Sequence, residues 1–124
     1  MHIHPAELSD AVVIAQISRS AREQAMPYLP NLHTPTEDLA FFTTEIGSSD
    51  CRVAVINAQV VGFGCVRGGW LNHLYISPEF QGRGFGSELL KNFGAVVEQF
   101  WVFQKNSRAR DFYKRHGFVE VEFT

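Results

Sequence analysis

Three alternating glycines precede an apolar helical segment, and they are the first feature of this sequence that could do chemistry. The stretch SPEFQGRGFGSELL, residues 77–90, places Gly82, Gly84 and Gly86 within five positions. Glycine inside a regular element costs about 0.5–1 kcal/mol relative to alanine, so this spacing indicates a special backbone path. The first amides of a helix have no partner within it, and together with the helix dipole they can cradle a phosphate or pyrophosphate.

The loop matches neither of the two common phosphate-binding fingerprints. A Walker loop closes with Gly-Lys-Ser or Gly-Lys-Thr, whereas Gly86-Ser87 lacks the lysine. The dinucleotide fingerprint is G-x-G-x-x-G, whereas the spacing here is G-x-G-x-G. The shared physics still favours an anion site, to which Arg83 would add positive charge and Ser87 a further hydrogen-bond donor. For the glycines alone, a strand-to-helix turn that serves only packing is the alternative.

Hydrophobic spacing predicts the elements that must position this loop. No repeat or low-complexity segment interrupts the chain, so we expect a single domain over residues 1–124, of α/β (α+β) type. Ser9 or Asp10 is expected to cap the first helix, and Gly47 to Asp50 to form a turn. We expect four helices: the first begins near residue 10, and the others cover about 36–46, 85–99 and 107–116. The expected strands cover 2–5, 51–56, 60–66, 70–76, 100–103 and 118–123.

Composition narrows the class of protein. A chain of 124 residues that is 45% hydrophobic and 19% charged is typical of one globular domain. A net charge of −2 argues against nucleic acid as a partner. No apolar run approaches the roughly 20 residues of a membrane span, and the N-terminus lacks a secretion signal. We therefore expect a cytoplasmic protein with no membrane partner, in which Cys51 and Cys65 are reduced core residues.

Two motifs in the correct order resemble the GNAT superfamily of N-acetyltransferases. The run Gln81-Gly82-Arg83-Gly84-Phe85-Gly86, preceded by HLYISPEF, is similar to the family's acetyl-CoA motif, Gln/Arg-x-x-Gly-x-Gly/Ala after an apolar-Tyr-apolar strand. Residues 106–121, NSRARDFYKRHGFVEV, resemble the family's asparagine-led helix that carries Phe-Tyr and ends in Gly-Phe. The resemblance covers essentially the whole chain. It implies a mixed, mostly antiparallel sheet with splayed fourth and fifth strands and about four helices.

The resemblance also implies a chemistry and a set of binding residues. The reaction would be acyl transfer from acetyl-CoA, as cosubstrate, to an amine, with no metal. The strand segment Leu74-Tyr75-Ile76 would line the pantetheine arm, with the main chain of Leu74 and Ile76 pairing with its amides. Asn106 would contact the arm from the other side, and a helix N-cap is its alternative role. The amides of Gln81, Gly82, Arg83, Gly84, Phe85, Gly86 and Ser87 would hold the pyrophosphate.

Tyr113 is the residue we expect to act in catalysis. In the family's helix motif a tyrosine at this position can give a proton to the departing coenzyme A thiolate. The alternative is that Tyr113 is only the polar-tipped neighbour of Phe112, a core residue.

The general base is not fixed by the sequence. Trp70 and Asn72 stand where the family often places a base on the fourth strand, and neither side chain can act as one. His73 is the candidate base, although strand alternation points it to the face opposite Asn72 unless a bulge intervenes; a packed or surface histidine is the alternative. His33 could lie over the acceptor mouth, and Glu79 is expected to face solvent.

The acceptor and the oligomeric state are predicted only in outline. The segment MPYLPNLHTP, residues 26–35, is placed to shape an apolar acceptor mouth, or else to plug the core. GNAT domains usually add one more strand after the segment that corresponds to 118–123. Its apparent absence here leaves a sheet edge that a homodimer could fill. His2 and His4 form an H-x-H without a nearby acidic or cysteine ligand, so no metal site is expected.

The leading functional prediction is therefore an N-acetyltransferase that acts on a primary amine of a small molecule or peptide, by direct attack on acetyl-CoA. A catalytically silent acyl-CoA-binding or regulatory module is the second possibility. A nucleotide-phosphate-binding domain of another fold is the third, and it requires the second motif to be a coincidence.

Overall fold

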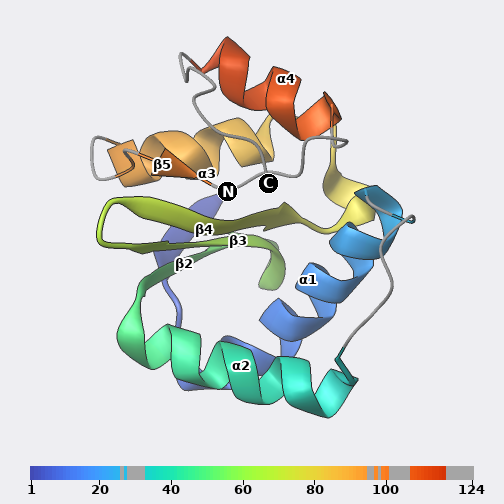
Figure 1. Ribbon diagram of the computed structural model, residues 1–124, viewed down its shortest axis with the longest axis vertical. Coiled ribbons are helices and arrows are strands. Elements are labelled where there is room, and N and C mark those ends of the chain that lie inside the picture. The colour runs from blue at the N-terminus through green and yellow to red at the C-terminus, as the bar shows by residue number, and fades with distance from the viewer. Residues whose placement is uncertain (26, 28–32, 95–96, 98, 101–106, 117–124) are drawn as a thin grey trace.

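One five-stranded sheet organises the computed structural model, which describes residues 1–25, 27, 33–94, 97, 99–100 and 107–116 (Figure 1). The strand order follows the chain, the first three pairings are antiparallel, and the last is parallel. This confirms the predicted mixed, mostly antiparallel sheet. The strands are β1 (His2–Pro5), β2 (Asp50–Ile56), β3 (Gln59–Arg67), β4 (Trp70–Ile76) and β5 (Gln99–Phe100).

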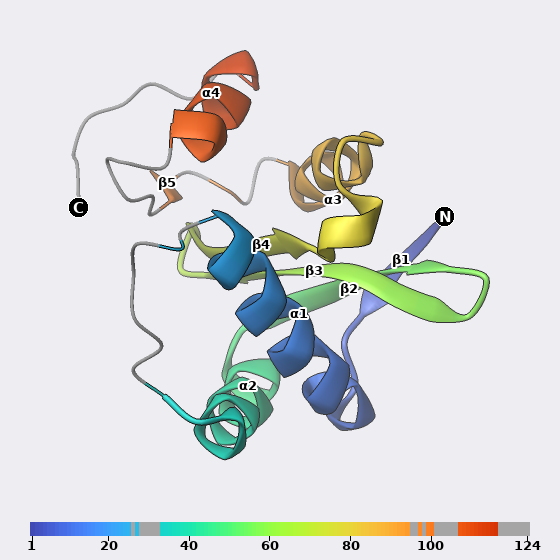
Figure 2. The ribbon, with the colours of Figure 1, turned by 90° about the vertical axis from the view of Figure 1, so that its right-hand side faces the viewer.

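Helices cover both faces of the sheet, as Figure 2 shows. The helices α1 (Ala11–Ala25) and α2 (Pro35–Ser48) lie on one face, and α3 (Phe85–Phe93) and α4 (Ser107–Arg115) lie on the other. Short 3-10 turns, Leu8–Asp10 and Pro78–Phe80, precede α1 and the glycine loop. None of the described helices combines the length and the hydropathy needed to cross a membrane.

Local capping explains where the first two helices begin. A carboxylate oxygen of Asp10 accepts the backbone N–H of Glu7 at 2.8 Å, in the capping box of the 3-10 turn Leu8–Asp10 that directly precedes α1. At α2, the Thr34 hydroxyl accepts the Glu37 amide at 3.2 Å and the Glu37 carboxylate accepts the Thr34 amide at 2.9 Å, which is a capping box. Pro35 occupies the first helical turn, where its missing N–H costs nothing.

Two helix ends differ from the sequence prediction. The helix α2 continues through Gly47 to Ser48, where a turn was expected. The helix α3 ends at Phe93 and not near Gln99, because Gly94 adopts a φ of 61° and its amide bonds back to the Leu90 carbonyl.

The sheet divides the core into two layers. The layer under α1 and α2 and the layer under α3 and α4 each bury apolar side chains, and burial of one such side chain contributes about 1.5–3 kcal/mol. The first layer contains Ile14, Ala15, Ile17, Phe42, Cys51, Val53, Phe63 and Cys65. The second contains Val66, Leu71, Ile76, Leu89, Leu90, Phe93, Val97 and Tyr113.

Several predicted features lie outside the described residues. These are Asn106, Trp101 to Phe103 of the predicted strand at 100–103, Gly117, the strand at 118–123 and most of the proline-rich segment at 26–35.

Candidate active site

The glycine loop joins β4 to α3 through two left-handed residues. Gly84 is the N-cap of α3 with a φ of 84°, and Gly82 has a φ of 77°. A Cβ atom at either position would meet no other atom within 4 Å, so the glycines are needed for their backbone angles and not for lack of space. The loop therefore leaves open space in front of the helix terminus.

The amides at the start of α3 face this space without a partner in the helix. The first intrahelical bond runs from the Glu88 amide to the Gly84 carbonyl at 3.1 Å. The amides of Phe85, Gly86 and Ser87 come before it and are the donors that a helix leaves unsatisfied. Together with the dipole of α3, three such donors fit a pyrophosphate group.

Gln81 and Arg83 are held by neighbours within the loop. The Gln81 side chain donates from Nε2 to the Ile76 carbonyl at 2.9 Å, and its own amide lies 3.4 Å from the Pro78 carbonyl. The guanidinium of Arg83 stands 5.3 Å from the centre of the Phe80 ring, a cation–π contact. Gln81 therefore fixes the loop to the end of β4, and Arg83 places positive charge beside it.

One edge of β4 has no strand partner over most of its length in the described part of the chain. The strand β5 pairs only with Trp70 and Leu71. The Ser77 amide bonds to Val61 on the β3 side at 2.8 Å. By alternation the main chain of Ile76, and of Leu74 two residues earlier, faces the opposite, open edge. The main chain of Tyr75 faces β3, with which it is paired at Phe63.

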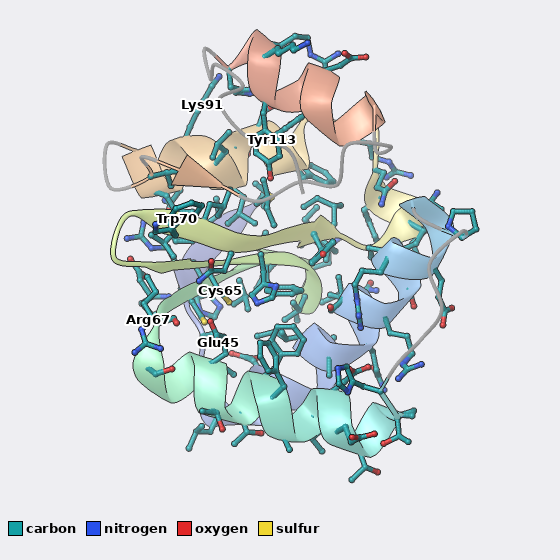
Figure 3. All side chains as sticks on the ribbon, in the orientation of Figure 1. Glu45, Cys65, Arg67, Trp70, Lys91 and Tyr113 are labelled. Atoms are coloured by element: carbon teal, nitrogen blue, oxygen red, sulfur yellow. The ribbon has the colours of Figure 1, made fainter. Side chains whose placement is uncertain are left out.

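Tyr113 lies in the core layer between α4 and the sheet. Its side chain points from α4 toward the strands in Figure 3, and it packs in the same buried cluster as Leu71 and Ile76. Burial raises the pKa of the Tyr113 hydroxyl above its ordinary value of 10.0, and the nearby Tyr75 hydroxyl raises that pKa further. The phenol therefore keeps its proton throughout the neutral pH range, as a proton donor must.

His73 lies on the α2 face of β4, as Tyr75 does, whereas Leu71 lies on the opposite face because a bulge intervenes between Leu71 and His73. Cys65 pairs with His73 and Val66 pairs with Leu71, which leaves Asn72 as an extra residue of β4. The His73 ring meets Phe41 and Phe42 of α2 edge-on, with ring centres 5.6 and 5.2 Å away.

The surroundings of His73 keep its ring neutral. Burial lowers the pKa of His73 below its ordinary value of 6.5, and the charge of Arg22 acts in the same direction while Glu45 opposes it. At neutral pH the ring can therefore accept a proton.

The other candidate acid–base groups have structural partners. The exposed His33 lies 3.8 Å from the Glu37 carboxylate, and its carbonyl accepts a hydrogen bond from Arg19 at 2.6 Å. The Glu79 carboxylate accepts the Ser77 hydroxyl at 3.2 Å. Neither contact joins these residues to Tyr113 or to the open edge of β4.

A buried ion pair between α1 and α2 was not anticipated from the sequence. Asp38 of α2 is 5% exposed. Its carboxylate lies 2.8 Å from Nη2 of Arg19 and 3.5 Å from Nη2 of Arg22. The spacing of the two arginines, three residues apart on a helix whose other face is apolar, is the signal that could have found the pair.

Comparison with known proteins identifies the family. Residues 47–120 match the family described as acetyltransferase (GNAT) domain, which is more than half of the chain. The chain belongs to the GNAT family. The matched region contains both the glycine loop and the tyrosine of α4.

Relatives and solved structures agree with this assignment. The uncharacterized N-acetyltransferase MJ1207 of Methanocaldococcus jannaschii is 31% identical over 56% of this chain, and YafP of Escherichia coli, with the same description, is 33% identical over 63%. The aligned regions make up 39% and 51% of those two proteins, so the chain spans about half of their length or less.

Two crystal structures show that the GNAT fold is present. A GCN5-related N-acetyltransferase from Rhodopseudomonas palustris gives a TM-score of 0.82 at 20% identity and covers 98% of this chain and 82% of its own. The PaiA N-acetyltransferase from Thermoplasma acidophilum, crystallised in complex with coenzyme A, gives 0.77 at 20% identity, covering 99% and 91%.

Proposed function

We propose that this GNAT protein transfers the acetyl group of acetyl-CoA to a primary amine of a small molecule or peptide. The observation that carries the proposal is that three features lie around β4 in the described part of the chain. These are the unpaired amides at the start of α3, the open edge of β4 and the buried, protonated Tyr113. Membership of the GNAT family supports the same reaction class.

The loop and the strand would hold the cosubstrate at two points. The amides from Gly82 to Ser87, with Arg83, would bind the pyrophosphate, while Gln81 keeps the loop fixed to Ile76. The main-chain groups of Leu74 and Ile76 at the open edge would pair with the pantetheine arm as an added strand does. The contact that we predict for Asn106 belongs to this proposal.

Tyr113 would act as the general acid. When bound, acetyl-CoA supplies a thioester carbon for the amine to attack and a thiolate leaving group. The Tyr113 hydroxyl, which burial keeps protonated, would give its proton to that sulfur.

The candidate base is His73. A primary alkyl ammonium has an ordinary pKa near 10.4, so the attacking amine must lose a proton. The lowered pKa of His73 makes its ring neutral and able to accept one. His73 would then act from the α2 face of β4, while Tyr113 acts from the α4 face.

A silent acyl-CoA-binding module is the second proposal. It is favoured by the packing of His73, whose ring contacts Phe41, Phe42, Phe63 and Tyr75 and is therefore well placed for a purely structural role. The two proposals share the cosubstrate site and differ only in turnover. A homodimer also remains a prediction, which sedimentation equilibrium would test.

The deciding experiment measures acetyl-CoA binding by calorimetry and then coenzyme A release across a panel of primary amines. In Gly84→Ala the left-handed backbone at Gly84 costs about 1–2 kcal/mol, so we expect affinity to fall about tenfold as the loop shifts its amides. Gly47→Ala, in the exposed part of α2, is the matched control and should bind normally. Binding without turnover would favour the silent module, and failure of the unaltered chain to bind would refute both proposals.

A further inference from the structure

Two cysteines that the proposed reaction does not use face each other across the sheet. Cys51 of β2 and Cys65 of β3 are register partners, and their sulfur atoms are 2.8 Å apart. Both are free thiols, and they are 5% and 0% exposed. Figure 3 shows Cys65 between the strands and α2, on the side of Glu45 and away from α3 and α4.

The backbone places these residues at bridging distance. The Cys51 carbonyl accepts the Ala6 amide at 2.8 Å, so the main chain of Cys51 faces β1 and not β3. Cys51 and Cys65 are therefore a non-hydrogen-bonded pair, in which Cα atoms lie only about 4.5 Å apart and side chains are closest. Disulfides accept Cα separations of about 4.4–6.8 Å, with the sulfurs about 2 Å apart. Bond formation thus needs the sulfur atoms to approach by less than about 1 Å.

We propose that Cys51 and Cys65 form a site of reversible oxidation, closing to a cross-strand disulfide when the protein meets a peroxide. The Cys51 sulfur attacks one peroxide oxygen, the O–O bond breaks, and with hydrogen peroxide the products are a sulfenic acid on Cys51 and one water. The Cys65 sulfur then attacks the Cys51 sulfur, and the hydroxyl leaves with the Cys65 proton as a second water. Two thiols are oxidised and one peroxide is reduced to two waters. A dithiol reductant reverses the bond by exchange.

The structure distinguishes the roles of the two sulfurs. Cys51 is the second residue of β2, shortly after the end of α2, and its sulfur lies 3.5 Å from the Glu45 carbonyl in the last turn of that helix. Cys65 is fully enclosed, and its contact with Cys51, together with burial, raises the pKa of its thiol far above the ordinary value. Because Cys51 is the more exposed of the two, at 5% against 0%, it is the sulfur that a peroxide reaches first, and Cys65, whose sulfur lies 2.8 Å away, is the one that resolves the sulfenic acid. A peroxide is small and uncharged, which suits a pair this deeply buried.

The disulfide would lie next to His73, the candidate base of the proposed active site. Cys65 is also the partner of His73 across β3 and β4, so the three side-chain positions form one row under α2. Formation of the disulfide does not depend on acetyl transfer, and its test measures the masses of peptides and not enzymatic activity.

The experiment treats the reduced, folded protein with hydrogen peroxide, blocks remaining thiols and maps tryptic peptides. Cleavage at Arg22, Arg52 and Arg67 places Cys51 in peptide 23–52 and Cys65 in peptide 53–67. The proposal expects these two peptides to appear joined, with the loss of two hydrogens, and to separate after treatment with dithiothreitol. Peptide 23–52 also contains Met26, whose sulfoxide adds an oxygen and is distinguished from the bridge by mass.

Single variants test the order of events. In Cys65→Ala, Cys51 should accumulate a sulfenic acid that dimedone traps, whereas in Cys51→Ala, Cys65 should stay a thiol under the same treatment. If either variant fails to fold, the peptide map of the unaltered protein decides alone. The proposal is overturned if both thiols remain free after peroxide treatment, if either cysteine passes directly to sulfinic acid, or if the disulfide joins two chains.

Discussion

The carbonyl oxygen of Ile76 accepts a 2.9 Å hydrogen bond from Nε2 of Gln81, and this bond ties the last residue of β4 to the first residue of the glycine loop. The open edge of β4 and the amides at the start of α3 are separate features in the sequence. The Gln81 side chain fixes one relative to the other, so that a single extended ligand can contact both.

Replacement of Gln81 by methionine tests this coupling. Gln81→Met keeps the length of the side chain but removes the donor, and a net hydrogen bond contributes about 0.5–1.5 kcal/mol. We expect acetyl-CoA affinity in calorimetry to fall about threefold to tenfold. Gln24→Met, on the exposed surface of α1, is the control. Equal affinities for the two variants would show that the bond does not position the site.

The variant Tyr113→Phe isolates the proton donor. It removes one hydroxyl from a buried ring, so we expect acetyl-CoA affinity to be kept while turnover falls by about 10²–10⁴, the usual contribution of a general acid. Because burial and Tyr75 raise the pKa of Tyr113, the turnover of the unaltered protein should show no decline near pH 10 that titration of Tyr113 would cause. Tyr75→Phe removes the neighbouring hydroxyl and is the comparison. A turnover loss that is equal in both variants would count against a specific role for Tyr113.

His73 should make stability depend on pH in the acidic range. Its pKa in the folded protein is lowered below 6.5 by burial and by Arg22, against the pull of Glu45, so the unfolded chain binds the proton more readily. The contribution of neutral His73 to the free energy of unfolding should therefore be fully present above pH 6.5. It should decrease as the pH falls below that value, by at most about 1.4 kcal/mol per pH unit for one proton.

Urea denaturation between pH 7 and pH 5 measures this effect. His73→Phe keeps an aromatic ring among Phe41, Phe42 and Phe63 but cannot titrate, so its pH dependence over this range should be weaker. An identical dependence in both proteins would show that other groups cause it.

Removal of Asp38 tests the ion pair between α1 and α2. The variant Asp38→Ala leaves Arg19 and Arg22 without their buried partner, but these side chains are 22% and 33% exposed and can regain water. We therefore expect a loss of about 1–3 kcal/mol in the free energy of unfolding, below the usual cost of breaking a fully buried pair. Glu23→Ala, at an exposed contact 3.9 Å from Arg19, should change stability by less than about 0.5 kcal/mol. A similar small change for both would mean that Asp38 contributes little.

Features with a local physical cause were predictable from the sequence. The alternating glycines indicate left-handed backbone before α3, and Gly82 and Gly84 adopt it. The apolar spacing of Leu89, Leu90 and Phe93 is typical of the buried face of a helix, and all three are buried in α3. The family motifs identified the fold because their order along the chain, and not either motif alone, is specific.

Features that depend on tertiary contacts were not predictable in the same way. The end of α3 at Phe93 depends on Gly94 adopting a left-handed angle, although the apolar pattern continues to Val97. The surroundings of His73 depend on which residue of β3 pairs with it, and a two-residue alternation counted along β4 gives the wrong relation across Asn72. The spacing of Arg19 and Arg22 places both on one side of α1, but their partner Asp38, 19 and 16 positions away, is set by the packing of α1 against α2.

The extra residue at Asn72 follows directly after Leu71, the last position at which β4 pairs with β5. A bulge bends its strand and increases the local twist, so β4 bends directly after the two positions at which the described residues pair it with β5. The bend therefore depends on the number of residues in β4 and not on the kind of side chain at position 72. Most substitutions at Asn72 should be tolerated, whereas deletion of that single residue would remove the bulge while Leu71 kept its face opposite His73, and β4 would lose the bend.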